Sequence, residues 1–410
     1  MNRVVAVVVI VCLALALVWL GALVLGDRPG DSRRPNDVEA GPDASDDSSH
    51  GASDGAGSGL TPEQRQELDR LATLGYIAGK EPTPDETGLL RFDRQRSYEG
   101  YTLFTCAQGA EAFLIDMEGN VVHEWRHPGS EYWARAHVMP NGDLLAMTSR
   151  PYRLMKLDSE SRLVWRFERT AHHDFEVQDD GTIVALVREA VSVPQVHGGQ
   201  YVLDDNVVTL SQDGLELSSV SLLSAFESSD EYGDWLTTRG LPDPPDIFHT
   251  NSVQVVERGG RRQALLSVRA IDTVTLVDLE SGKVVWAATG PWRRQHEAMF
   301  VGDNLLLFDN LGAGETSRVL ELEFPSLEQV WSYTEDGFHS EGAGSQQRLP
   351  NGNTLIVESD AGRIIEVTES GDVVWEYVNP RSVMRGDKEL VLGFMRAERI
   401  PADFPMAWAR

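Results

Sequence analysis

The sequence predicts an all-β fold, a six-bladed β-propeller, on the strength of two repeated features. The first is a short strand closed by tryptophan, which recurs at Trp125, Trp165, Trp286, Trp331 and Trp375. Consecutive copies lie 40, 45 and 44 residues apart (125 to 165, 286 to 331 and 331 to 375). The second is that each repeat reads as four short strands, and four strands in about 40–45 residues are typical of a propeller blade. A degenerate copy, Asp213-Gly-Leu-Glu-Leu217, completes six units.

The chain begins with an apolar segment that we predict to be a transmembrane anchor. Residues 4–26 are 23 residues without a charge, which is long enough to span a bilayer. This run is longer than that of a usual cleaved signal peptide, and no convincing small-x-small cleavage site accompanies it. We therefore expect an uncleaved signal anchor at residues 1–26. The rest of the chain would lie outside the cytoplasm, in a periplasm or at the cell surface.

Two further segments are expected before the propeller. Residues 27–60 are rich in Gly, Ser, Asp and Pro and have few large apolar side chains, so we predict a disordered acidic linker. A short helix should follow at residues 61–76, with Thr61 as N-cap, Pro62 in the first turn and Gln64 completing a capping box. The propeller itself should span residues 90–400.

The expected blades account for the remaining sequence. Each tryptophan should pack between neighbouring blades, because the apolar face of one sheet must be covered by the next. The long gap between Trp165 and Trp286 contains an insertion, roughly residues 219–246, with helix-like and Pro-rich stretches. Residues 381–410 are predicted to return a strand that closes the ring, with the apolar run Leu390-Val-Leu-Gly-Phe394 as its candidate.

Composition excludes several classes of partner. The net charge of −28 argues against nucleic acid, whose phosphates require clustered Lys and Arg. Neither a P-loop nor a Gly-x-Gly-x-x-Gly motif is present, so the sequence predicts no nucleotide and no other cofactor. The two cysteines are Cys12, inside the apolar segment, and Cys106, which makes an intrachain disulfide implausible.

Histidines recur before or at the first strand of successive units, at His137, His173, His249, His296 and His339. The first strand of a propeller blade lines the central channel. These side chains are therefore predicted to converge at one mouth of the channel and to form a polar functional pocket. A single histidine of this kind would more simply be structural, bonded to a loop carbonyl.

Three kinds of chemistry remain open for such a pocket. Imidazoles could bind zinc or copper, with Asp174 or Glu297 as an oxygen ligand, but no His-x-His or His-x-x-x-His spacing occurs and we predict no metal. A general base could act on a carbohydrate or an ester, although no Gly-x-Ser-x-Gly elbow is present. Histidine could also be a nucleophile in group transfer. Arg269 then suits an anion clamp, or it is a solvated charge at a blade edge.

These motifs resemble the bacterial arylsulfotransferase family. The specific part is the order of His172-His-Asp174, His249-Thr-Asn-Ser252, Ser267-Val-Arg269 and Gln295-His-Glu297, within a resemblance that covers about residues 97–380. The resemblance implies a six-bladed propeller that acts outside the cytoplasm. It also implies transfer of a sulfuryl group from an aryl sulfate to a phenolic acceptor, without a nucleotide sulfate donor.

The resemblance also assigns roles to individual residues. His296 matches the histidine that becomes transiently sulfated, while His249 and Arg269 match residues that bind the sulfuryl group. The remaining active-site histidine is His173, with His172 as the close alternative. Substrate-binding candidates are Asn251, His172, His339 and His137. The expected partners are the aryl sulfate, the phenol and, through the N-terminal helix, a membrane; the oligomeric state is left open.

Two other functions compete with this one. A non-catalytic propeller, tethered for binding or scaffolding, could keep the histidine ring for ligand binding or for structure. A metal-dependent hydrolase could also be built on the same fold, since fold does not fix function.

Overall fold

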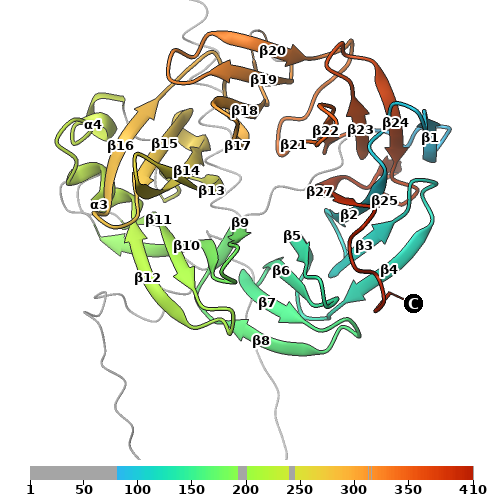
Figure 1. Ribbon diagram of the computed structural model, residues 1–410, viewed down its shortest axis with the longest axis horizontal. Helices are drawn as coiled ribbons and strands as arrows, with labels where there is room; N and C mark the ends of the chain where they lie inside the picture. The colour runs from blue at the N-terminus through green and yellow to red at the C-terminus, as the bar shows by residue number, and fades with distance from the viewer. Residues whose placement is uncertain (1–80, 193–200, 240–244, 313, 315, 410) are drawn as a thin grey trace, which may run out of the picture. The chain divides into compact units, whose positions relative to one another are not determined.

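The computed structural model describes residues 81–192, 201–239, 245–312, 314 and 316–409. Within these ranges, six antiparallel sheets stand around a central channel, which confirms the predicted six-bladed β-propeller (Figure 1). The predicted anchor, linker and first helix, residues 1–76, lie outside the described residues. Among the residues that are described, no helix is long and apolar enough to cross a membrane.

Each blade runs from an inner strand at the channel to an outer strand at the rim. The first three blades in chain order are β27-β2-β3-β4 (Phe394–Pro401, Gly100–Cys106, Glu111–Ile115, Val121–Arg126), β5-β6-β7-β8 (Tyr132–Val138, Leu144–Ser149, Arg153–Leu157, Leu163–Phe167) and β9-β10-β11-β12 (Ala171–Val177, Ile183–Ser192, Tyr201–Leu210, Glu216–Ser221). The other three are β13-β14-β15-β16 (Thr250–Arg258, Arg261–Val268, Thr273–Asp278, Lys283–Ala288), β17-β18-β19-β20 (His296–Val301, Asn304–Asp309, Arg318–Glu323, Gln329–Tyr333) and β21-β22-β23-β24 (Ser345–Arg348, Thr354–Glu358, Arg363–Val367, Val373–Val378).

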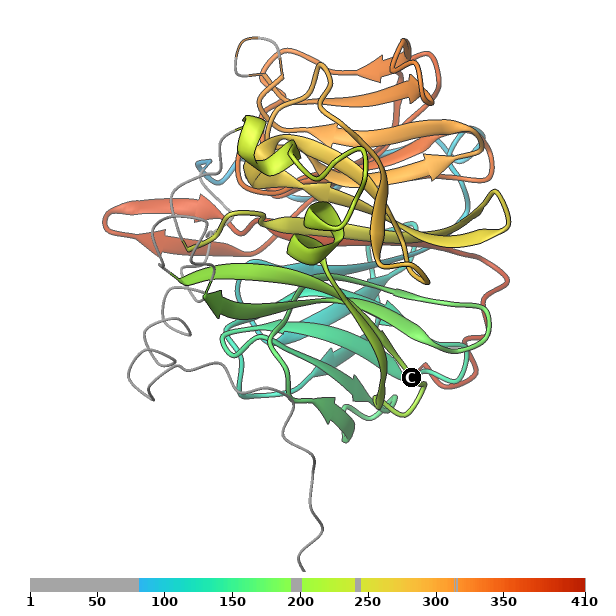
Figure 2. The same ribbon diagram turned by 90° about the vertical axis from the view of Figure 1, so that its left-hand side faces the viewer.

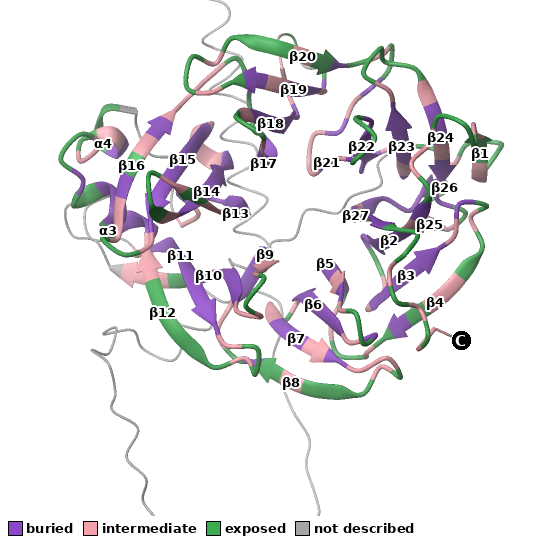
Figure 3. Ribbon diagram, in the orientation of Figure 1, coloured by how far each residue is buried: buried purple, intermediate pink, exposed green. Residues whose placement is uncertain are grey.

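The core of the propeller lies between the blades. Middle strands such as β6 (LLAMTS) and β22 (TLIVE) are buried at every position, because both of their faces are covered by neighbouring sheets. Outer strands such as β8 and β20 face solvent on most positions. Figure 3 shows this gradient from purple near the channel to green at the rim. An apolar run without strict alternation is therefore the expected pattern for the middle strands.

The recurring tryptophans join one blade to the next, as predicted. Trp125 Nε1 on β4 donates to the Gly142 carbonyl, 3.2 Å away, in the β5–β6 turn of the following blade. Trp165, Trp331 and Trp375 reach a turn carbonyl of the following blade in the same way. Trp286 instead packs against Phe324, with 4.8 Å between ring centroids. The degenerate unit has Leu217 on its outer strand, and this side chain is exposed.

The ring is closed by β27, which pairs with β2 over Gly100↔Pro401 to Cys106↔Phe394. The predicted returning strand is therefore confirmed, but it begins at Phe394. Leu390 and Val391 belong to a separate hairpin, β25–β26 (Ser382–Arg385 and Lys388–Val391), which projects from the ring and is red-orange in Figure 2. Strand β1 (Gly88–Phe92) adds a fifth strand to the last blade by pairing with β24.

The insertion at residues 219–246 holds two short helices, α3 (Leu222–Glu227) and α4 (Trp235–Arg239). Ser221 caps α3, because its side chain accepts a hydrogen bond from the Ser224 N–H. Leu222, Leu223 and Phe226 are buried in a cluster with residues of the third and fourth blades. After these helices the chain returns to the channel mouth at Asp246, where it meets the candidate site.

Candidate functional site

A cavity of about 210 Å³ lies at the end of the channel where the inner strands begin. Each of the six inner strands contributes a lining residue from its first three positions. Those on the central strands are His173 of β9, Asn251 of β13, and His296 and Glu297 of β17. Because equivalent strands of a propeller all begin at one end of the channel, residues far apart in sequence meet here.

His296 is held in one tautomer. Its Nδ1 lies 2.7 Å from Asn310 Oδ1 and 3.2 Å from the Arg294 carbonyl oxygen. The Asn310 amide orientation is fixed because its Nδ2 donates to the carbonyls of Ser340 and Ala343, at 2.7 and 2.9 Å. Since both neighbours of Nδ1 are acceptors, Nδ1 carries the proton. The lone pair is therefore on Nε2, the other nitrogen of a ring that lines the cavity.

The His296 ring is also neutral. Burial, and then the positive charge of Arg269, lower the pKa of His296 to about 3. Arg269 follows β14 directly, and its N–H donates to the His249 carbonyl across the β13–β14 pairing at 3.3 Å. A neutral ring with a defined tautomer has the electronic form of a nucleophile at physiological pH.

His249 is paired with a carboxylate from the insertion. Its Nδ1 lies 2.6 Å from Asp246 Oδ2, and its backbone N–H donates to Asp246 Oδ1 at 3.1 Å. Arg188 Nη2 lies 3.1 Å from the same Oδ1. Burial alone would raise the pKa of Asp246, but Arg188 and then His249 lower it. Asp246 is thus ionised and holds the proton of His249 on Nδ1.

His173 and His172 form a second chain of contacts. Their Nδ1 atoms lie 2.7 Å apart, and His172 Nε2 lies 3.1 Å from Asp205 Oδ1. Because Nε2 of His172 faces a carboxylate, its Nδ1 is the acceptor and His173 Nδ1 the donor. Burial lowers the pKa of His173 well below its usual value, and the neighbouring His249, whose ring centroid is 4.8 Å away, acts in the same direction.

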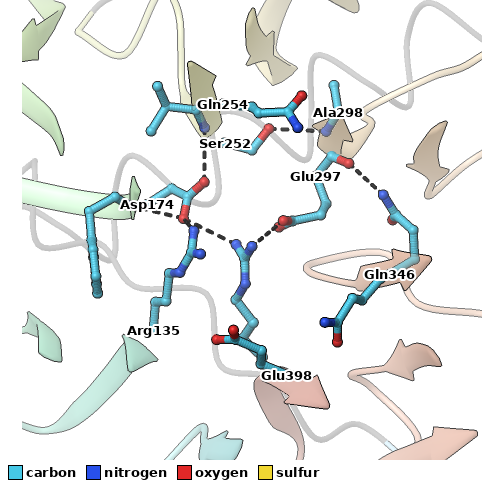
Figure 4. Close-up of polar contacts among 12 residues, drawn as sticks. Arg135, Asp174, Ser252, Gln254, Glu297, Ala298, Gln346 and Glu398 are labelled. Carbon is cyan, nitrogen blue, oxygen red and sulfur yellow. Dashed lines mark hydrogen bonds and ion pairs between the residues drawn. The ribbon is translucent and has the colours of Figure 1, made fainter. Parts of the chain in front are cut away.

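The floor of the cavity is an ion network across the channel (Figure 4). Arg396 of β27 binds Glu297 Oε1 through Nη2 and donates from Nη1 to Asp174 Oδ1 at 3.1 Å. Arg135 of β5 binds the same Asp174 oxygen. Asp174 Oδ2 accepts the Val253 N–H at 2.8 Å. Four inner strands are therefore tied together by charge directly below the cavity.

The predicted site residues fall into three groups. His173, His249, Asn251 and His296 line the cavity. Arg269 and His172 are buried beside these histidines. His137 and His339 do not line it. The structure therefore does not bring these two into the cavity with His173, His249 and His296.

His137 and His339 lie outside the cavity lining because of where they stand relative to the inner strands. His137 is the sixth residue of β5, where it faces Glu398, whereas His296 is the first residue of β17. At roughly 3.3 Å per residue this places His137 deeper in the channel by about five strand residues. His339 precedes β21 by several residues, and its N–H donates to Glu358 Oε1 at 2.9 Å.

Several residues of the site were not predicted from the sequence, among them Asn310, Asp246, Arg188 and Arg396. A signal existed for Asn310: the Gly302-Asp303 turn pairs Val301 with Asn304, and counting back along this hairpin brings His296 to the level of Phe308 and Asp309. Asp246 ends an insertion of irregular structure, so no periodicity predicted its approach to His249.

The oxygen ligands considered for a metal are engaged otherwise. Asp174 and Glu297 bind Arg396, and Asp174 also binds Arg135. In the described ranges, no group of three or more His, Cys, Asp and Glu side chains could hold a metal ion.

Solved structures that are similar include a protein of unknown function from Bacteroides caccae (13% identity, 68% of this chain and 93% of that chain, TM-score 0.47). Others are a streptogramin B lyase (11%, 80% and 97%, TM-score 0.45) and a catalytically inactive virginiamycin B lyase from Staphylococcus aureus with quinupristin (10%, 72% and 88%, TM-score 0.41). No curated protein matches the chain in sequence. A family model described as Arylsulfotransferase (ASST) matches residues 135–380, more than half of the chain.

Proposed function

The chain belongs to the arylsulfotransferase family, and from this premise we propose that it transfers a sulfuryl group from an aryl sulfate ester to a phenolic acceptor through a sulfated His296. The single observation that carries the proposal is the state of His296. The ring is neutral, its proton is on Nδ1, and it lines a cavity with Nε2 available as the nucleophile.

In the first half-reaction, Nε2 attacks the sulfur and the bond from sulfur to the aryl oxygen breaks. The phenolate departs, and the sulfated ring becomes an imidazolium that keeps its proton on Nδ1. Asn310 Oδ1 accepts that Nδ1–H at 2.7 Å and stabilises the new positive charge. In the second half-reaction the acceptor phenol gives its proton to a base as its oxygen bonds to sulfur, the bond from Nε2 to sulfur breaks, and His296 returns to its neutral form with its proton still on Nδ1.

The negative charge of the sulfuryl oxygens requires donors nearby. Arg269 is close enough to His296 for its charge to lower the pKa of that ring. His249 and Asn251 line the same cavity from the neighbouring blade. We assign donation to the sulfuryl oxygens to Arg269 and Asn251, because donors aimed at developing charge in a buried site stabilise a transition state strongly. His249, whose Nδ1 proton is held by Asp246, lines the cavity beside them.

The size of the cavity supports a two-step route. An apolar protein cavity of about 150 Å³ holds one benzene molecule. The cavity here, about 210 Å³, has room for one aryl ring and a sulfuryl group. This size supports ping-pong order, in which the first phenol leaves before the acceptor binds.

We further propose that residues 4–26 anchor the protein in a membrane with the propeller outside the cytoplasm. The length of the uncharged run supports this placement. Fractionation of cells and protease treatment of intact cells would test it: the propeller should remain with membranes and be cleaved from outside. A soluble cytoplasmic protein would contradict it.

The first prediction tests the transfer itself. Without acceptor, the protein should release a burst of one 4-nitrophenol per site from 4-nitrophenyl sulfate, and the His296 peptide should gain the mass of one sulfuryl group. With acceptor, initial-rate lines should be parallel. His296→Ala should lose burst and mass gain, whereas His127→Ala, in a surface turn, should retain both. Intersecting lines, or a metal-dependent release of phenol and free sulfate, would reject the proposal.

A further inference from the structure

We propose that Glu297 is the acid–base group of this transfer, which protonates the departing phenolate and takes the proton of the incoming phenol. The inference rests on the proposed function and adds a catalytic residue to it. The contacts of His296 give the nucleophile a fixed tautomer, but transfer between phenols also moves a proton out and back.

The backbone brings Glu297 to the cavity beside the nucleophile. Adjacent residues of a regular strand point to opposite faces. Here Glu297 has a φ of +52°, and the pairing of β17 with β18 shifts register between His296 and Met299. A bulge of this kind re-aims a side chain, and as a result His296 and Glu297 line the same cavity. The Glu297 carbonyl is fixed by Gln346 Nε2 at 2.5 Å (Figure 4).

The charges around Glu297 allow its carboxyl group to gain and lose a proton. The charged groups that face it are Arg396 of β27, Asp174 of β9 and Arg135 of β5, and Glu398 of β27 faces the same two guanidinium groups. Three carboxyl groups thus share two guanidinium groups, and Glu398 also has His137 as a partner. Burial raises the pKa of Glu297 to about 7; Arg396 opposes this shift, and the nearby Asp174 carboxylate adds to it. Arg396 binds Oε1, which leaves Oε2 as the atom to exchange a proton.

The cavity histidines are less suited to supplying a proton. Burial lowers the pKa values of His173 and His296, so both rings are neutral at pH 7 and have no proton to spare. His249 commits its Nδ1 proton to Asp246. Glu297 can be either protonated or ionised near pH 7, which is the condition for an efficient general acid and base.

The steps balance. When His296 Nε2 bonds to sulfur, the aryl oxygen leaves with the electron pair and takes the proton of Glu297. The free phenol departs, and an ionised Glu297 faces the cationic sulfated imidazole. The acceptor phenol then gives its proton to Glu297 as its oxygen bonds to sulfur and the bond from nitrogen to sulfur breaks. The free enzyme is restored with Glu297 protonated.

The second prediction uses the acidity of the leaving group as the probe. Glu297→Gln keeps the shape and an oxygen for Arg396 but cannot exchange the proton. Sulfation of His296 should slow roughly 10²–10³-fold with phenyl sulfate, whose phenolate needs a proton. With 4-nitrophenyl sulfate, whose phenolate is stable without one, the loss should be less than about threefold. Glu297→Asp should recover part of the rate with phenyl sulfate.

A matched control and a pH profile complete the test. Glu398→Gln removes a partly buried carboxyl group that faces the same guanidinium groups but lies outside the cavity lining, and it should slow both donors by the same factor. In the parent protein, sulfation by phenyl sulfate should fall, and transfer to phenol should rise, as pH increases through about 7. Both dependences should flatten in Glu297→Gln.

Equal losses with the two donors in Glu297→Gln, or an unchanged pH profile, would overturn the role of Glu297 while leaving the sulfated His296 intact. A parent protein that releases no nitrophenol from 4-nitrophenyl sulfate would overturn the proposed function itself, and this inference with it.

Discussion

Asn310 decides which nitrogen of His296 carries the proton, and this gives the third prediction. Asn310→Leu removes the nearer of the two acceptors of Nδ1–H, leaving the Arg294 carbonyl at 3.2 Å, and favours the tautomer with the proton on Nε2, the proposed attacking atom. Burst rate should fall roughly 10²–10⁴-fold, as when a wrong tautomer is imposed on a catalytic histidine. Nitrogen-15 NMR of His296 should show the proton moving from Nδ1 to Nε2.

Asn310→Asp is the matched variant, since it keeps an oxygen acceptor. It should preserve the Nδ1–H tautomer and most of the rate, although it loses the donors to Ser340 and Ala343. If Asn310→Asp were as slow as Asn310→Leu with the tautomer unchanged, Asn310 would matter for anchoring the 340–343 loop and not for the ring.

Single residues of the site were predictable only where strand register governs them. His173, Asn251 and His296 stand within the first three positions of inner strands, and His249 stands one residue before one, so repetition alone brought them to one cavity. His137 stands outside the cavity lining because this residue lies near the end of β5, and the sequence repeat does not show that difference in position along the strand. Asp246 reaches His249 through packing of an insertion, which no repeat encodes.

Among the elements, the outer strands were the most predictable and the closing strand the least. Four of the outer strands carry a tryptophan that donates to a turn carbonyl of the next blade, and this residue therefore recurs visibly in sequence. Strand β27 has no such mark. Its sequence, FMRAERIP, contains three charged residues. Arg396 binds acidic side chains of the cavity floor, and Arg399 pairs with Glu366 in the buried core. Hydrophobicity alone therefore could not predict that this strand is buried.

Arg399 of this strand provides the fourth prediction. It is buried, its Nη1 lies 3.1 Å from Glu366 Oε2, and its Nε donates to Thr102 Oγ1 at 3.0 Å. Arg399→Met should lower the free energy of unfolding by about 3–5 kcal/mol, because Glu366 would be left charged and buried without its partner. Urea unfolding followed by tryptophan fluorescence measures the loss.

Two further variants separate the loss of the ion pair from the effect of an unpaired buried charge. The double variant Arg399→Met/Glu366→Leu should recover much of the stability, because no unpaired charge remains. Arg96→Ala removes an exposed ion pair to Asp93 and Asp372 and should leave stability nearly unchanged. A double variant less stable than Arg399→Met would mean that the pair itself, and not the stranded charge, holds β27.

For the propeller as a whole, the fifth prediction is a single unfolding transition. Each blade is covered on both faces by its neighbours, so losing one blade exposes the apolar faces of two others. Unfolding by urea should give coincident curves from far-ultraviolet circular dichroism and from tryptophan fluorescence. Open repeat arrays, in which terminal units have one free face, can unfold in stages instead. Separate midpoints for the two signals would show that the ring is not one cooperative unit.

The position of β27 has a consequence during synthesis on the ribosome. Strands β2, β3 and β4 emerge among the first, yet their blade lacks its inner strand until residues 394–401 have been made. The nascent chain must keep an open sheet edge on β2 for most of its elongation. The same late strand brings Arg396 to the cavity floor, so ring closure and completion of the candidate site are one event. A ribosome that stops some twenty codons early would release a chain whose ring is open and whose candidate site lacks Arg396.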